Sequence, residues 1–282
     1  MHKSSRIRRG YTSCRFGHLH YRSCGSAAPD RNPVVLLHQN PSSSYEYEAL
    51  IEALGRNRLV YAFDTPGYGM SDAPPAPPGM AGYAQAFSDG LDALAESGEL
   101  TGKVDLYGFH TGTLLACELA LARPDRVRSV ALTGIPMFDE ATLREKLAYA
   151  ETFPTPDEDG TVIIDLLSNL WKYVVGARDP KVPLEKAVFN FADKAHVLDR
   201  FTWAYKGVWS YDYARLEMVE QPALLLQPAE QIREPSLKAA ARMQRCTVTE
   251  MPDLDRDIFD IAPERIANEL CNFFDQHGPS DR

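Results

Sequence analysis

One stretch of the sequence, residues 104–116, limits the fold more than any other part of the chain. A short apolar segment with strand character runs into a turn that is flanked by Gly108 and Gly112, and a run of small and apolar residues with helix character follows. Glycines on both sides of one residue allow a strand to bend sharply into a helix, with the side chain between them exposed. That residue is His110. The sequence therefore predicts a strand, a strained turn that carries an imidazole, and a helix.

Strand-like and helix-like segments alternate along most of the chain. This alternation is typical of an α/β fold with a mostly parallel central sheet and helices on both faces. An alternating stretch from Tyr11 to Tyr21 predicts a first hairpin. The other expected strands are 33–37, 59–63, 127–133, 223–226 and 246–250 besides the one at 104, and the expected helices are 45–54, 82–96, 236–245 and 263–275.

The segment 135–219 differs from the rest, because strand signals become rare and aromatic and charged residues mix at helical spacing. Prolines interrupt it at several points. We expect a helical cap at 135–219, inserted into a core formed by 10–134 and 220–276. Asp139 is interpreted as the residue that caps a helix over 141–148, in preference to a relocated catalytic acid.

The composition excludes several classes of function. The chain has 282 residues, of which 44% are hydrophobic, and a formal net charge of −9. An acidic chain is a poor partner for nucleic acids and anionic membranes. No apolar run approaches the ~18 residues that are needed to span a bilayer. We therefore expect a globular protein that binds a small-molecule substrate or ligand, and neither nucleic acid nor a membrane. The sequence does not decide between a monomer and a homodimer.

Five cysteines without a CxxC pair are most simply reduced thiols in the cytoplasm, and we expect no metal site. Residues 1–29 are basic, contain serines and lack acids, so a targeting segment is an alternative for them. The hairpin between Tyr11 and Tyr21 favours the interpretation that they belong to the folded domain. The expected localisation is cytoplasmic.

Two further turns carry a resemblance to a known family. Residues 38–41 match the His-Gly-x-Pro turn and residues 64–71 match the Asp-x-Pro-Gly-x-Gly-x-Ser turn of the α/β-hydrolase superfamily, and residues 104–116 match its nucleophile elbow. The sequence around Asn40 resembles that of the haloalkane-dehalogenase and esterase-like branch, where an Asn at this position helps to hold the leaving halide. Gln39 replaces a family glycine, which narrows the mouth of the pocket. The resemblance covers residues from about 10 to 276 and implies the α/β-hydrolase fold.

The same resemblance implies a catalytic triad, and this chain departs from it at every position. The family has a nucleophile at the elbow, an acid after the late strand and a histidine before the last helix. Those positions hold His110, Gln231 and Arg256. A primary amide is not basic and a guanidinium stays charged, so the usual proton relay is absent. A shift of one residue would make Glu230 the acid. No histidine lies within ten residues of Arg256, and the one histidine that comes after it, His277, follows the last helix.

Other parts of the family's site are retained. The backbone N–H groups of Asn40 and Thr111 are expected to form an oxyanion hole, which stabilises developing negative charge. His38 is expected to support that turn, next to Gln39 at the edge of the pocket. Aromatic side chains of the cap should line the pocket in part and favour an apolar or aromatic ligand. The tryptophans among these candidates are Trp171, Trp203 and Trp209.

Two functions follow as hypotheses. In the first, the protein is an enzyme without a cofactor that acts on a small apolar or aromatic carbonyl or ester compound by hydrolase or lyase chemistry. His110 would be a general base or a nucleophile, because imidazole suits proton transfer near neutral pH. Arg256 would keep it neutral or bind a substrate carboxylate. In the second, the chain is an inactive relative that binds a small ligand or a protein. The strained elbow favours the enzyme.

Overall fold

A computed structural model describes residues 6–155 and 157–276, and all structural statements refer to these residues. His277 and the first five residues of the basic N-terminal stretch lie outside them. The centre is an eight-stranded sheet. Its strands are β1 (Arg8–Cys14), β2 (Gly17–Cys24), β3 (Val34–Leu37), β4 (Val60–Phe63), β5 (Val104–Phe109), β6 (Val127–Thr133), β7 (Ala223–Pro228) and β8 (Cys246–Met251).

The strand order is β1-β2-β4-β3-β5-β6-β7-β8. β2 pairs antiparallel with both β1 and β4, and all other neighbours are parallel. Parallel strands place their carboxyl ends along one edge of the sheet, where ligands bind in open α/β folds. The predicted mostly parallel sheet, which opens with a hairpin, is confirmed.

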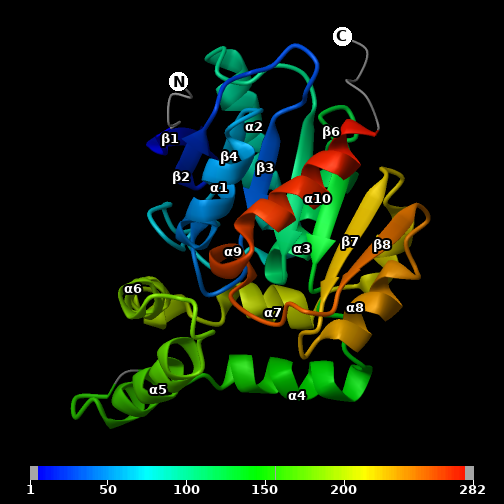
Figure 1. Cartoon of the computed structure of the whole chain (residues 1–282). Coiled ribbons are helices and arrows are strands. Elements are labelled where there is room, and N and C mark those ends of the chain that lie inside the picture. The colour runs from blue at the N-terminus through cyan, green and yellow to red at the C-terminus, as the bar shows by residue number, and fades with distance from the viewer. Residues whose placement is uncertain (1–5, 156, 277–282) are drawn as a thin grey trace.

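Alternate residues of each central strand enter two different hydrophobic cores, because side chains of a strand point to opposite faces in turn. Val34 and Leu36 of β3 pack in one core, whereas Val35 and Leu37 pack in the other. The first core contains α1 (Glu48–Leu54), α9 (Ile258–Ile261) and α10 (Pro263–Asp275); the second contains α2 (Gly79–Glu96), α3 (Thr111–Ala122) and part of α8 (Arg233–Ala240). Figure 1 shows α1 and α10 on one face of the sheet and α2 and α3 on the other.

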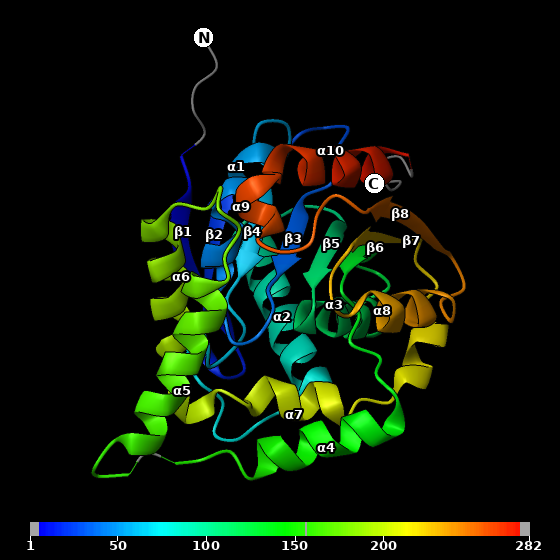
Figure 2. The same cartoon turned by 60° about the horizontal axis from the view of Figure 1, so that its bottom comes forward.

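A group of helices fills the segment between β6 and β7. Figures 1 and 2 show that α4 to α7 lie beyond one end of the strands. Asp139 caps α4, since its Oδ1 accepts a hydrogen bond from the Thr142 N–H at 2.9 Å. These elements are α4 (Glu140–Glu151), α5 (Thr161–Trp171), the π-helical turn η2 (Lys172–Gly176), α6 (Leu184–Ala195), the 3₁₀ turn η3 (Leu198–Arg200), α7 (Trp203–Trp209) and the 3₁₀ turn η4 (Tyr213–Met218).

Several elements differ from the prediction. α2 begins three residues before the expected residue 82, and the first part of the helix expected at 45–54 is the 3₁₀ turn η1 (Ser44–Tyr47). The helix expected at 236–245 is α8, which begins three residues earlier because the Arg233 N–H bonds to the carbonyl oxygen of Glu230. Residues after Ala240 form a turn instead of continuing the helix. The short helix α9 was not expected. None of the helices within 6–155 and 157–276 is both long and apolar enough to cross a membrane.

The turn after β4 is tied to β2 and to the segment before α1 by the fully buried Asp64. Its Oδ1 accepts from the Ser44 N–H at 2.7 Å, and its Oδ2 accepts from the Met70 N–H at 2.9 Å and lies 2.8 Å from His20 Nδ1. Burial by itself raises the pKa of Asp64, but the hydrogen bond and charge of His20 and the Ser44 hydrogen bond lower it from 3.8 to about 2. The fold therefore holds this carboxyl group in its charged form.

Asp64 predicts a pH dependence of stability. Because its folded pKa lies below the unfolded value, it stabilises the fold above about pH 4 and loses this effect as the pH falls toward about 2. The full effect is about 2 kcal/mol in the free energy of unfolding, of which about half falls between about pH 6 and about pH 3. Urea unfolding of Asp64→Asn should lack this part, whereas the exposed Asp72→Asn should retain it. An equal pH dependence in wild type and Asp64→Asn would contradict the assignment.

Candidate active site

A single residue separates β5 from α3. β5 ends at Phe109, α3 begins at Thr111, and His110 between them has φ +49° and ψ −111°. A positive φ is rare for a residue with a side chain and costs of order 1–3 kcal/mol. A Cβ added at Gly112 would collide with the carbonyl oxygen of Leu37. The helix can therefore pack this closely against the sheet only because this position is glycine.

The imidazole of His110 is held at both nitrogens. Nε2 lies 2.6 Å from Oε2 of Glu230, and Nδ1 lies 3.1 Å from Oε1 of Gln39. The side-chain nitrogen of Gln39 donates to Oε2 of Glu46 at 2.9 Å, which turns the amide oxygen of Gln39 toward the imidazole. Because both neighbours are acceptors, only the doubly protonated imidazolium can donate to both at once. The His110 side chain is 30% exposed and that of Glu230 is 8% exposed, so the pair is partly shielded from water.

A glycine after β6 leaves the space for this pair. Gly134 has φ +75°, and a Cβ added to it would collide with His110 Cδ2 and lie 2.9 Å from Oε1 of Glu230. No other side chain fits this position without moving the imidazole or the carboxylate. Gly134 is therefore a positioning residue for the contact between them.

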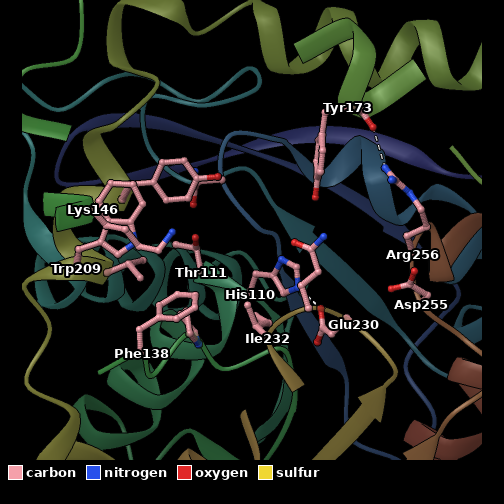
Figure 3. A pocket seen from close by; sticks show the side chains of 15 residues that line it. His110, Thr111, Phe138, Lys146, Tyr173, Trp209, Glu230, Ile232, Asp255 and Arg256 are labelled. Atoms are coloured by element: carbon pink, nitrogen blue, oxygen red, sulfur yellow. Dashed lines mark hydrogen bonds and ion pairs between the residues drawn. The ribbon is translucent and has the colours of Figure 1, made fainter. Parts of the chain in front are cut away.

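The His110–Glu230 pair borders a cavity of about 340 Å³, called the central cavity below. It lies where the residues that follow β5, β6, β7 and β8 meet α4, η2 and α7. Figure 3 shows His110 and Glu230 between Lys146, Trp209 and Phe138 on one side and Tyr173 and Arg256 on the other. The residues that line it are Asn40, His110, Thr111, Pro136, Phe138, Lys146, Tyr173, Tyr205, Val208, Trp209, Glu230, Gln231, Ile232, Asp255 and Arg256.

Asn40 lines the central cavity with unused hydrogen-bonding groups. Its side chain is buried, and neither its amide nitrogen nor its amide oxygen has a partner among the described residues. Thr111 is the first residue of α3, so its N–H has no partner inside the helix. A buried polar group without a partner costs about 1–3 kcal/mol. A ligand oxygen that accepts from these two residues would remove much of that cost.

The other expected site residues are distributed unevenly. Gln231 lines the central cavity but is exposed, and Glu230, one residue earlier, is the acid that reaches His110. His38 is fully buried: its Nε2 accepts from the Thr65 N–H at 2.8 Å and its Nδ1 lies 2.6 Å from the Gln39 carbonyl oxygen. Through these two contacts His38 supports the turn at Gln39.

Of the three tryptophans expected at the pocket, Trp209 lines the central cavity and the other two do not. Trp171 lies at the end of α5, where its ring packs edge-on against Phe191 and is 42% exposed. Trp203 is the first residue of α7 and does not belong to the cavity lining. Tyr205, another aromatic residue of α7, does line the cavity, and its ring stacks on that of Trp209 with the ring centroids 4.9 Å apart.

Arg256 lines the central cavity without touching His110. Its Nη2 donates to the carbonyl oxygen of Tyr173 at 2.8 Å, its guanidinium lies 5.1 Å from the centre of the Tyr173 ring, and its Nε lies 3.3 Å from Asp257 Oδ2. The expectation that Arg256 acts on the imidazole therefore lacks a contact to carry it. The side chain instead links the segment after β8 to η2.

Several residues of the site were not singled out from the sequence. Gly134 follows a predicted strand, and a glycine at a strand's carboxyl end is the signal that could have drawn attention to it. The anchoring of Gln39 by Glu46 joins two turns of the same loop, and nothing in the sequence marks it. Phe138 and Lys146 also lack a sequence signal, because their place at the cavity depends on how α4 packs.

Gly134 provides a test of this geometry. Gly134→Ala should displace the imidazole from Glu230 and also strain the backbone, whereas Gly102→Ala, at φ +73° with no atom within 4 Å of the added Cβ, adds only the strain. We expect Gly102→Ala to lower the free energy of unfolding by about 1 kcal/mol and Gly134→Ala to lower it by more. The NMR signals of the His110 ring should shift only in Gly134→Ala. Unchanged ring signals in that variant would mean that the close approach is not real.

Comparison with known proteins gives consistent results. The sequence family described as alpha/beta hydrolase fold matches residues 32–227. A haloalkane dehalogenase from Bradyrhizobium diazoefficiens is 25% identical over 267 residues, which cover 81% of each chain. A pimeloyl-(acyl-carrier protein) methyl ester esterase from Neisseria meningitidis is 33% identical over 101 residues, and the chain spans only 36% of that relative's length.

The solved structures support the same fold. The enol-lactonase from Burkholderia xenovorans LB400 superposes with a TM-score of 0.77 and 16% sequence identity, and the match covers 94% of this chain and 99% of that one. At this identity the likeness concerns the fold alone. It confirms the expected arrangement of a mostly parallel sheet with helices on both faces.

Proposed function

Since the chain belongs to the alpha/beta hydrolase fold family, we propose that it is an enzyme of hydrolase type that works without a cofactor on a small apolar or aromatic carbonyl or ester compound. Residues 10–134 and 220–276 would form the core and residues 135–219 the cap. The observation that carries the proposal is the 2.6 Å contact between His110 Nε2 and Glu230 Oε2 beside the central cavity.

In this proposal His110 is the general base. Glu230 holds the N–H of Nε2, which leaves Nδ1 as the nitrogen that takes a proton. A water molecule gives that proton to Nδ1 while its oxygen attacks the carbonyl carbon of the ligand. The imidazolium that forms donates to Glu230 and to Oε1 of Gln39, the two acceptors that the structure places around it. The charged product of proton transfer is thus the form for which the site is arranged.

Asn40 and Thr111 would receive the negative charge that develops on the carbonyl oxygen. The backbone N–H of Thr111 lies at the N-terminus of α3, where the helix dipole favours an anion. The side-chain amide of Asn40 has no competing partner. When the tetrahedral intermediate collapses, the leaving oxygen takes the proton back from Nδ1, so the base returns to its starting state.

A general base fits this geometry better than a nucleophile. To form an acyl-imidazole, Nδ1 would have to leave Gln39 and approach the carbonyl carbon to bonding distance. As a base, Nδ1 also exchanges Gln39 for a water molecule, but the carbonyl carbon can then stay one water away from it.

An alternative function also has an observation in its favour. Both nitrogens of His110 are hydrogen-bonded, and no histidine ring in 6–155 and 157–276 bonds to a serine hydroxyl. An inactive relative that binds a small ligand or a protein would show the same contacts. The unpaired amide of Asn40 would then serve binding alone.

Activity measurements separate the two functions. Wild type should hydrolyse members of a panel of p-nitrophenyl esters and aromatic lactones, and His110→Ala should lower kcat by roughly 10²- to 10⁴-fold. Glu230→Gln should lower kcat and change the pH profile, because the acceptor at Nε2 loses its charge. The exposed His18→Ala is the control and should keep full activity.

The variant His110→Ser tests whether His110 is the base of the site. Since no histidine other than His110 lines the central cavity, a serine at the elbow has no base and should not create an esterase. Strong ester turnover by His110→Ser would show that the base lies elsewhere. Absence of turnover by wild type on the whole panel, with ligand binding unchanged in His110→Ala, would favour the binding protein.

A further inference from the structure

Lys146, on α4, brings a positive charge to the central cavity that no carboxylate of the described residues neutralises. The residue lines the cavity, and its ammonium group has no ion pair within 4.0 Å among 6–155 and 157–276. Glu140, on the same helix, pairs with Arg144 instead. A cation that lines a ligand cavity without a counter-ion is a ready partner for an anionic group of a ligand.

Aromatic rings hold this ammonium group in place. It lies 5.0 Å from the centre of the Phe138 ring and 5.8 Å from that of Trp209, both within the range of a cation–π contact. Tyr205 stacks on Trp209 with the two ring planes 1° apart. Figure 3 shows Lys146, Trp209 and Phe138 together on one side of the cavity. The charge is therefore framed by flat apolar surfaces that suit an aromatic ring.

The other charges of the cavity are already paired or stand on the opposite side. Glu230 is engaged by His110, and Arg256 is engaged by Asp257 and by the carbonyl oxygen of Tyr173. Asp255 is exposed and lies next to Arg256 in Figure 3, away from Lys146. Lys146 is thus the cation that remains free to receive a ligand anion.

We propose that the ligand of the central cavity is an aromatic compound with a free carboxylate, and that Lys146 binds this carboxylate. The inference rests on the proposed function for the choice of cavity and for the reacting end. The carboxylate accepts hydrogen bonds from the ammonium group, and the ring lies against Trp209 and Phe138. The separate carbonyl group that reacts lies at Asn40 and Thr111. The substrate class is therefore an ester or lactone that carries a second, unesterified carboxylate.

Calorimetric binding of two unreactive probes tests the proposal without any turnover. 3-Phenylpropionate carries the ring and the carboxylate, and 3-phenylpropionamide is its neutral counterpart. Wild type should bind the acid at least roughly tenfold more tightly than the amide, as expected for a hydrogen bond to a charged group. Lys146→Met keeps the aliphatic stem and removes the charge, so it should abolish the preference for the acid over the amide. Lys172→Met, an exposed lysine outside the cavity lining, removes the same charge and should preserve the preference.

Three results would overturn the proposal: equal affinities of acid and amide for wild type, no binding of either probe, or a preference for the acid that survives Lys146→Met. The outcome is independent of catalysis. A preference for the acid that depends on Lys146, in a protein that hydrolyses no ester of the panel, would keep the ligand class and remove the proposed reaction. Ester turnover with no preference for the acid would do the reverse.

Discussion

The contact between His110 and Glu230 depends on backbone geometry more than on either side chain. The elbow holds His110 at a positive φ, so the imidazole leaves the carboxyl end of β5 in one direction only. Glu230 approaches from the segment after β7, and the two meet because Gly134 leaves the space between them. One contact of 2.6 Å therefore links the segments after β5 and β7, next to the segment after β6 at Gly134. A change in any of the loops would alter the cavity that they border.

The pair also bears on the elbow position, where the resemblance implies a nucleophile and this chain has an imidazole. In the arrangement that the resemblance implies, the acid reaches the elbow residue through a histidine that lies between them. Here the histidine is itself the elbow residue, and Glu230 binds it directly. The resemblance puts Arg256 at the position of the family's histidine, and a guanidinium has no proton to transfer near neutral pH. In the structure its guanidinium joins η2 to the segment after β8 through Tyr173 and Asp257.

The sequence predicted those features that follow from local patterns. Short continuous apolar runs gave the central strands, alternation gave the first hairpin, and the glycines around His110 gave the turn between β5 and α3. The cap of α4 by Asp139 followed from its place before a helical run. Side-chain partners were predicted less well, because they depend on packing between distant segments. Glu230 was left as an alternative to Gln231, since a shift of one residue in a loop decides which of them faces His110. Trp171 and Trp209 are both aromatic residues of the segment predicted to be the cap, and the sequence does not distinguish them. Only the packing of α5 and α7 places Trp209, and not Trp171, at the cavity.

The unpaired amide of Asn40 bears on what kind of ligand the cavity selects. A buried amide with neither donor nor acceptor satisfied destabilises the empty protein, and a purely apolar ligand would leave that cost in place. A ligand oxygen that accepts from the Asn40 amide nitrogen would recover the part of this cost that the donor carries, so we expect the site to discriminate against compounds that lack such an oxygen. In the proposed binding mode Lys146, beside Phe138 and Trp209, adds a second polar requirement in the same cavity. Two polar anchors would restrict the orientation of a bound ligand more than one anchor does, and would keep its carbonyl group near His110.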